Sequence, residues 1–265
     1  MVKRDKVFIA GVLVVSFSLL LMVWLHRHYQ ITSQASGEQV QETRLPVFAE
    51  ISDTKARKRA FFAYLAPYVE ALNGRITQER LQILKMRDEL ESKGHLSNQT
   101  LYRLQAVAVA YRLDRFDLSV ESLDALLKRL DILPLEFVLI QAANESGWGT
   151  SRFAREGNNL FGLWCFKKGC GLVPKHRDEN AVHEVAAFSN MEQAISAYFK
   201  NLNTHPSYKH LRDLRFIAHQ QGNLVEASSL FEGLTAYSER GEAYVDELQA
   251  MLRQNQGLIR EVVTQ

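Results

Sequence analysis

The strongest constraint on this chain is an uncharged apolar run, VFIAGVLVVSFSLLLMVWL, which occupies residues 7–25. As a helix this run extends roughly 28 Å, close to the ~30 Å hydrocarbon core of a bilayer. Lys3, Arg4 and Lys6 precede it, and basic residues favour the cytoplasmic side of a membrane span. We therefore expect a single-pass anchor in the inner membrane, with the following residues in the periplasm or its equivalent.

A cleaved secretory signal is the alternative for this segment. The apolar region of such a signal is usually about 7–15 residues long, shorter than this run. A small-residue cleavage site does occur at Ser33-Gln34-Ala35, which would release the rest of the chain. Both interpretations export the polar, Ser- and Gln-containing linker expected at residues 30–50 and everything after it.

Composition indicates a globular exported part without a nucleic-acid partner. The chain has 32 Lys and Arg residues against 30 Asp and Glu residues, a formal net charge of +2. So small a charge produces no long-range field toward nucleic acid. Apolar residues make up 46% of the chain and aromatic residues 10%, enough to form a buried core.

The hydrophobic pattern predicts helices almost throughout the exported part. We expect one helix from Ser52 or Asp53 to Gly74 and a second from Thr77 to Gly94, because glycine commonly ends helices. The strands are expected at Leu163–Phe166 and His183–Phe188, as an antiparallel pair. The predicted fold is mainly α with one small antiparallel β-hairpin.

The two cysteines, Cys165 and Cys170, form a C-x4-C pair at the end of the first expected strand. In an oxidising compartment such a pair can close a small disulfide loop, and we favour this interpretation. Free thiols are one alternative. A metal site is the other, but only His176 and His183 are at hand as further ligands, so we expect no metal.

The residue best suited to chemistry is Glu145, which follows the helix expected at Pro134–Asn144. A carboxylate at the C-terminus of a helix faces the negative end of its dipole. Trp148, Phe161 and Trp164 would also remove solvent from it, and both effects raise a carboxyl pKa. Glu145 is therefore a candidate general acid in an aromatic cleft that stacks sugars. The alternative is that Glu145 only ends a helix and the aromatic rings belong to the core.

The run L-P-x-E-x-x-L-x-Q-A-A-x-E-S-G-W-G-T-S, followed by G-N-N-L-F-G-L-W, resembles the glucosaminidase domain of bacterial autolysins and of the flagellar rod cap hydrolase. The C-x4-C loop with G-L-V-P makes the chain resemble the membrane-linked bacterial Bax family more closely. This resemblance implies a lysozyme-like fold and an endo-β-N-acetylglucosaminidase that acts on peptidoglycan without a cofactor. It places Glu145 on the catalytic acid of the family, and Tyr237 and Tyr244 on two tyrosines near the sugar.

The resemblance also suggests further contacts and one gap. Substrate-binding residues are expected at Trp148, Asn158, Asn159, Phe161, Trp164 and Tyr244. Many family members carry a second glutamate on the hairpin, but none stands at that spacing here. Glu179 and Glu184 are the nearest substitutes. Without a second carboxylate, the 2-acetamido oxygen of the substrate can attack C1 instead.

These considerations divide the chain into residues 1–29 (cytoplasmic N-terminus and anchor), 30–50 (linker), 51–100 (helical extension), 101–255 (glucosaminidase-like domain) and 256–265 (tail). Two other functions remain open. A lytic transglycosylase would use the same single acid but form anhydro-ended products. A catalytically silent module would use the cleft only to bind cell-wall glycan.

Overall fold

The computed structural model describes residues 45–113, 115–175, 177 and 182–264. The expected membrane anchor at residues 7–25 lies outside these residues. In the described part, no helix has both the length and the apolar character needed to cross a bilayer. The end of the expected linker is packed against the helices that follow it. A short 3-10 helix, η1 (Phe48–Glu50), buries Phe48 edge-on against Phe61.

The longest element is α2 (Thr54–Lys93), which runs through the two helices expected at residues 53–94. The expected break at Gly74 was wrong. Buried apolar residues recur at seven-residue intervals along α2, at Phe62, Val69, Ile76, Ile83 and Leu90. Burying one such side chain contributes about 1.5–3 kcal/mol, which outweighs the ~1 kcal/mol cost of a glycine inside a helix.

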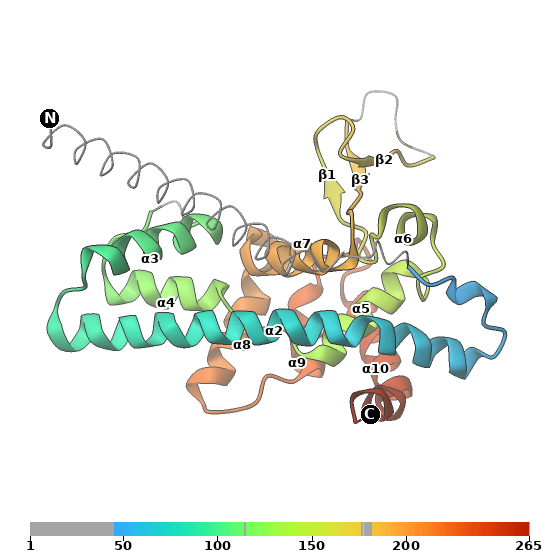
Figure 1. Cartoon of the computed structure of the whole chain (residues 1–265). Coiled ribbons are helices and arrows are strands. Elements are labelled where there is room, and N and C mark those ends of the chain that lie inside the picture. The colour runs from blue at the N-terminus through green and yellow to red at the C-terminus, as the bar shows by residue number, and fades with distance from the viewer. Residues whose placement is uncertain (1–44, 114, 176, 178–181, 265) are drawn as a thin grey trace, which may run out of the picture. The chain divides into compact units, whose positions relative to one another are not determined.

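Four helices pack directly against α2: α4 (Val120–Arg129), α5 (Leu135–Ser146), α7 (Met191–Thr204) and α10 (Glu242–Val263) (Figure 1). The C-terminal half of α2 contacts α4 through an ion pair between Arg87 and Asp124, and its N-terminal half contacts α10 through Arg59 and Glu261. The other helices are α3 (Asn98–Ala110), α6 (Arg152–Gly157), η2 (Pro206–Tyr208), α8 (Lys209–Gln220), α9 (Ala227–Phe231) and η3 (Glu232–Leu234). Most residues of α5 are buried, so the packing of its neighbours fixes the position of its C-terminal end.

The sheet has three strands, where one hairpin was expected. Strands β1 (Trp164–Cys165), β2 (Gly171–Leu172) and β3 (Glu184–Ala186) are antiparallel in the order β1-β3-β2, with Trp164 opposite Val185. The additional strand, β2, depends on Gly171, because a Cβ at this position would lie 2.0 Å from the Val185 carbonyl oxygen. Figure 1 shows the sheet on one side of the helices, next to α6 and α7. The prediction of a mainly helical fold is confirmed.

A buried ion network fastens α8 to the connection between α4 and α5. Asp131 and Arg215 have almost no exposed side-chain surface, and Arg215 Nε lies 3.2 Å from Asp131 Oδ2. His219 Nε2 lies 2.9 Å from the same carboxylate oxygen, and Arg80 approaches the other at 3.7 Å. Burial alone would raise the pKa of Asp131, but the charge of Arg215, the hydrogen bond with His219 and the charge of Arg80 hold it below its ordinary value.

Candidate active site

The candidate site begins where α5 ends. Gly147 adopts a left-handed conformation (φ 57°), and its N–H donates to the carbonyls of Ala143 and Asn144. The Ser146 hydroxyl donates to Ala142 and accepts the Gly149 N–H at 2.8 Å. These bonds stop the helix one residue after Glu145. The Glu145 carboxyl is therefore fixed at the negative end of the helix dipole, as the sequence predicts.

The Glu145 carboxyl is held from α10. The Tyr244 hydroxyl donates to Glu145 Oε1 at 2.6 Å, and only 2% of Tyr244 is exposed. Burial raises the pKa of Glu145 above its ordinary value. Tyr244 opposes the rise because its hydrogen bond favours the carboxylate, whereas the charge of Glu247 adds to it. The net direction is upward, which keeps the proton on Glu145 to higher pH, as a general acid requires.

Tyr244 is itself held by a buried chain of hydrogen bonds. Gln141 Nε2 donates to the Tyr244 hydroxyl at 3.1 Å, and the Tyr198 hydroxyl donates to Gln141 Oε1. Gln141 and Tyr198 have no exposed surface. Gln141 lies one helical turn before Glu145 on α5, so the same face of the helix carries the acid and the support of its partner.

Two more tyrosines extend this arrangement. The ring of Tyr237 is parallel to that of Tyr244, with centroids 5.9 Å apart, and Tyr208 lies 5.8 Å beyond it. The Tyr237 hydroxyl donates to the Phe161 carbonyl at 2.5 Å. Tyr237 therefore fixes the loop before β1 against the ring stack, and its hydroxyl makes no hydrogen bond with Glu145.

A cavity of about 550 Å³ lies beside these rings. Its lining comprises Arg112, Gly162, Leu163, Trp164, Cys165, Phe166, Ala186, Phe188, Ala197, Lys200, Asn201, His205, Tyr208 and Tyr237. Gly162 connects the cavity with the acid, because a Cβ at Gly162 would lie 3.8 Å from Glu145 Oε2. Trp164, on β1, is 53% exposed and offers its ring for stacking. The arrangement can donate a proton to a ligand that lies against aromatic surface.

The comparisons with known proteins agree with this geometry. The sequence model of the Glucosaminidase family, described as mannosyl-glycoprotein endo-beta-N-acetylglucosaminidase, matches residues 120–257. Protein bax of Escherichia coli (strain K12) is 34% identical over 226 residues, which cover 84% of this chain and 79% of the relative. The chain belongs to the glucosaminidase family. No solved structure matches it.

In this glucosaminidase-family chain, the two asparagines of the N-N-L-F-G motif organise the cavity wall. Asn159 is 2% exposed, and its Nδ2 donates to the carbonyls of Leu163 and Ala186 at 2.9 and 2.8 Å. Asn158 Nδ2 donates to the Phe188 carbonyl at 2.9 Å. These contacts hold the loop to β3 and to the segment after it, and the expected substrate contacts of both side chains stay a prediction.

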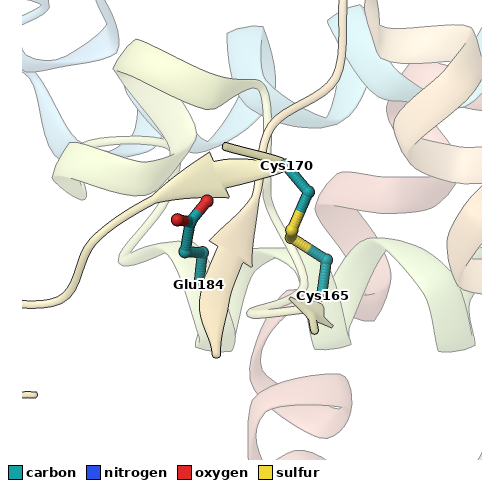
Figure 2. A group of neighbouring side chains, drawn as sticks. All are labelled: Cys165, Cys170 and Glu184. Atoms are coloured by element: carbon teal, nitrogen blue, oxygen red, sulfur yellow. A yellow bond between two sulfur atoms is a disulfide. The ribbon is translucent and has the colours of Figure 1, made fainter. Parts of the chain in front are cut away.

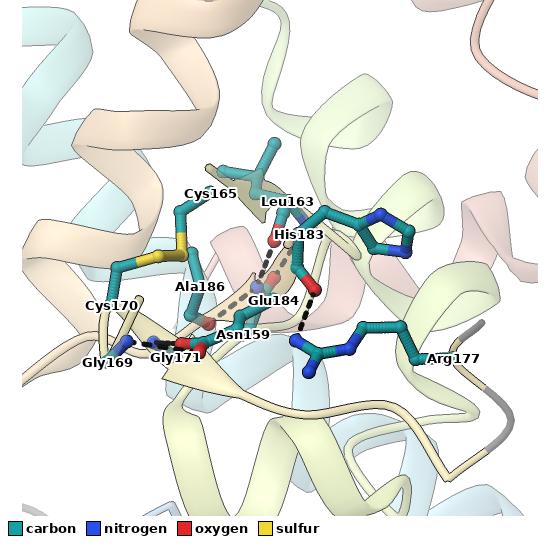
Figure 3. The surroundings of a disulfide bond; sticks show 10 residues. All are labelled: Asn159, Leu163, Cys165, Gly169, Cys170, Gly171, Arg177, His183, Glu184 and Ala186. Atoms are coloured by element: carbon teal, nitrogen blue, oxygen red, sulfur yellow. Dashed lines mark hydrogen bonds between the residues drawn. A yellow bond between two sulfur atoms is a disulfide. The ribbon is translucent and has the colours of Figure 1, made fainter. Parts of the chain in front are cut away.

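Glu184 was expected as a substitute for the second carboxylate, but the structure uses it to hold a loop. Its two oxygens accept the N–H groups of Gly169 and Gly171 at 3.0 and 2.8 Å (Figure 3). These bonds lower the pKa of Glu184. The role of Glu184 as a second catalytic carboxylate stays a prediction, and the contacts in the structure show it holding the loop between β1 and β2. Glu179, the other candidate, lies outside the described residues.

Cys165 and Cys170 are joined by a disulfide next to Glu184 (Figure 2). The sulfur atoms and a Glu184 oxygen lie within 4.8 Å of one another, a spacing that could hold a metal ion. Metal binding needs thiolates, however, and here both sulfurs are used in the bond. The same disulfide closes the loop after Trp164 and so fixes one wall of the cavity.

Two aromatic residues expected in the cleft pack against other rings, Phe161 within the core and the partly buried Trp148 at its edge. Trp148 packs edge-on against Phe61 and Phe62 of α2, and it does not line the cavity. Phe161 is 1% exposed and stacks on Tyr198 at 3.9 Å, so only its carbonyl serves the site. Helical spacing does not show which neighbour an aromatic ring will meet, and both rings find partners across the core.

The sequence analysis did not single out several residues that shape the site. Gln141 and Tyr198 hold Tyr244, and Tyr208 extends the ring stack. Gly162 leaves room beside the acid with φ +64°. The glycine of N-N-L-F-G was a usable signal, because a left-handed backbone next to the candidate acid favours glycine. Tyr198 carried no signal, since a buried tyrosine on a helix is ordinary core.

Proposed function

We propose that this chain is an endo-β-N-acetylglucosaminidase that hydrolyses the glycan strands of peptidoglycan, with a lysozyme-like catalytic domain. Its family points to glucosaminidase chemistry. The observation that carries the proposal is the placement of Glu145. This buried carboxyl has a raised pKa, is held by Tyr244 and lies next to a cavity with an exposed tryptophan.

In the first step, Glu145 donates its proton to the glycosidic oxygen while the bond from that oxygen to C1 breaks. The charge left on Glu145 faces the Tyr244 hydroxyl, which donates to it more strongly once the carboxylate forms. Tyr244 is thus a positioning residue that stabilises the product of proton transfer. Trp164 supplies the stacking surface for a sugar ring.

For the attack at C1, the contacts of Glu184 favour the substrate-assisted route over attack by this hairpin carboxylate. Both oxygens of Glu184 already accept backbone N–H groups. The 2-acetamido oxygen then bonds to C1 and forms a cyclic intermediate. Water adds to C1, opens that ring and returns a proton to Glu145. This course retains the configuration at C1, so NMR of the fresh product tests it. Inversion would show that a separate base activates the water.

The experiment for the function compares Glu145→Gln with wild type on isolated sacculi. Glu136→Gln is the matched control, because Glu136 lies in the first turn of the same helix and away from the cavity. We expect new reducing ends at N-acetylglucosamine with wild type and the control only. Cleavage that persists in Glu145→Gln would remove Glu145 from the mechanism.

The same experiment separates the two other functions. A lytic transglycosylase is favoured by the same use of Glu184 in holding a loop, and its anhydro product is one water lighter by mass spectrometry. A catalytically silent module would bind sacculi and release nothing.

We also propose that the enzyme acts in the periplasm, anchored in the inner membrane through residues 7–25 or released after signal cleavage. The Cys165–Cys170 disulfide supports an oxidising compartment. Protease added to spheroplasts should degrade the catalytic domain, and protection of the domain would place it in the cytoplasm. N-terminal sequencing of the recovered protein would distinguish the anchored form from the cleaved form.

A further inference from the structure

Two cations line the cavity that Glu145 borders. Lys200 lies on the face of α7 that also presents Ala197 and Asn201 to the cavity. Arg112 reaches the cavity from the segment after α3. Both are exposed. The Lys200 ammonium donates to the Ala110 carbonyl, so it is held near the end of α3.

The position of Arg112 is built into the backbone. Arg112 has φ 56°, a left-handed conformation that is uncommon for residues other than glycine. Arg129 Nη1 holds this turn by donating to the carbonyls of Tyr111 and Arg112 at 2.9 and 2.8 Å. The turn costs on the order of 1–2 kcal/mol, and the surrounding structure stabilises it.

The two positive charges have no acidic partner in the described part of the chain. Neither Arg112 nor Lys200 forms an ion pair there, although several ion pairs elsewhere join two exposed side chains. Burial lowers the pKa of Lys200, and the neighbouring charge of Arg112 lowers it further. Two like charges face one cavity, and an anionic ligand would relieve their repulsion.

The charges that shift the pKa of Glu145 are those of Glu247 and Arg240, and neither Arg112 nor Lys200 is among them. From Glu145, the contacts pass through Tyr244 to Tyr237 and then to Tyr208, with ring-to-ring steps of 5.9 and 5.8 Å. No carboxylate is among the causes that shift the pKa of Lys200. A group recognised by the cations would thus lie on the same ligand as the scissile bond but away from it.

We propose that Arg112 and Lys200 bind a carboxylate carried by the lactyl substituent of a muramyl sugar, at a subsite away from the bond that Glu145 cleaves. The inference rests on the proposed function. The carboxylate has two sources, the stem peptide or the lactyl group itself once the peptide has been removed. Recognition of this charge would distinguish peptidoglycan from neutral N-acetylglucosamine polymers.

The test compares the full-length variant Arg112→Gln/Lys200→Gln with wild type and with a control. Glutamine keeps a donor for the Ala110 carbonyl while removing the charge. Lys85→Gln/Arg253→Gln is the matched control, because it removes the same two charges from exposed positions outside the cavity. Thermal unfolding followed by circular dichroism verifies that each variant is folded.

Each protein is given three glycans: peptide-bearing strands, peptide-free strands with lactyl carboxylates, and peptide-free strands whose carboxylates have been amidated. Reducing-end release gives kcat and KM, and co-sedimentation with the strands gives binding. We expect the cavity variant to raise KM about 3- to 10-fold on carboxylate-bearing strands, from two solvent-exposed ion pairs. Its kcat should be unchanged, as should its KM on amidated strands.

The outcomes separate the sources and the two proposals. A KM effect confined to peptide-bearing strands assigns the stem peptide, and one confined to peptide-free strands assigns the lactyl carboxylate. An equal effect on amidated strands, or no effect on any, overturns the inference. If wild type releases no reducing ends, the proposed function fails, and co-sedimentation still decides whether the cation pair binds carboxylates.

Discussion

The hydrogen bond from Tyr244 to Glu145 leads to a prediction about the pH dependence of the enzyme. Tyr244→Phe removes one hydroxyl from a site that is 2% exposed and leaves the ring stack with Tyr237 in place. The lost hydrogen bond favours the ionised form of Glu145, so the substitution raises the pKa of this carboxyl further. A hydrogen bond to a charged group contributes about 1.5–3 kcal/mol, and one pKa unit equals about 1.4 kcal/mol. The expected rise is therefore about 1 to 2 units.

The sign for activity follows from the role of the acid. In the proposed mechanism Glu145 works in its protonated form, so activity falls as the pH rises through its pKa. This fall in activity is the alkaline limb of the pH profile. In Tyr244→Phe the limb should move to higher pH by about 1 to 2 units. The maximal rate should fall at the same time, because the carboxylate formed by proton transfer has lost its donor. Reducing-end release from sacculi, measured across the pH range, gives both quantities.

Tyr237→Phe is the matched control, since it removes a phenol hydroxyl from the next ring in the stack. That hydroxyl donates to the Phe161 carbonyl, so the alkaline limb should stay where it is in wild type. Carbon-13 NMR of a labelled Glu145 side chain provides a direct titration. An alkaline limb in Tyr244→Phe that stays in place or moves to lower pH would refute the reasoning.

Three further predictions concern the cavity wall and the core. Trp164→Ala should raise KM about 2- to 10-fold with little change in kcat, the contribution of one aromatic contact; an unchanged KM would exclude stacking. Glu184→Gln should keep kcat within about 3-fold of wild type, whereas a base would lose 100-fold or more. Asp131→Asn should destabilise the protein by about 3–5 kcal/mol, because Arg215 is left buried without its partner. Calorimetry should show a melting temperature lower by roughly 6–20 °C, and a change under about 2 °C would contradict the role of this ion pair.

The sequence indicated the acid because its signal is local. Glycines at 147 and 149 end the helix, and Glu145 stands just before them. The partner of the acid could not be derived in this way, since Tyr244 is 99 residues away and only the packing of α10 on α5 brings the two together. The resemblance to a family did point to Tyr244, but as a substrate contact. Its burial shows that it holds the acid instead.

The errors in the expected fold also have physical causes. Gly74 favours the end of a helix locally, but the buried residues on both sides of it continue as one stripe, and packing outweighs the local preference. Strand β2 is two residues long and is held by pairing with β3, so it has no periodicity of its own. Glu184 looked like an available carboxylate because its partners are backbone N–H groups, which a sequence does not reveal.

The packing of α2 also affects how the chain can be divided. The segment that matches the family begins at residue 120, yet α2 covers faces of α4, α5 and α10, all of which lie in that segment. A fragment cut at residue 120 would expose these apolar faces to water, and such a fragment tends to aggregate. A chimaera that exchanges the family-matching segment between relatives would therefore have to include α2 as well. Residues 54–93 and the segment that they pack against are expected to evolve together.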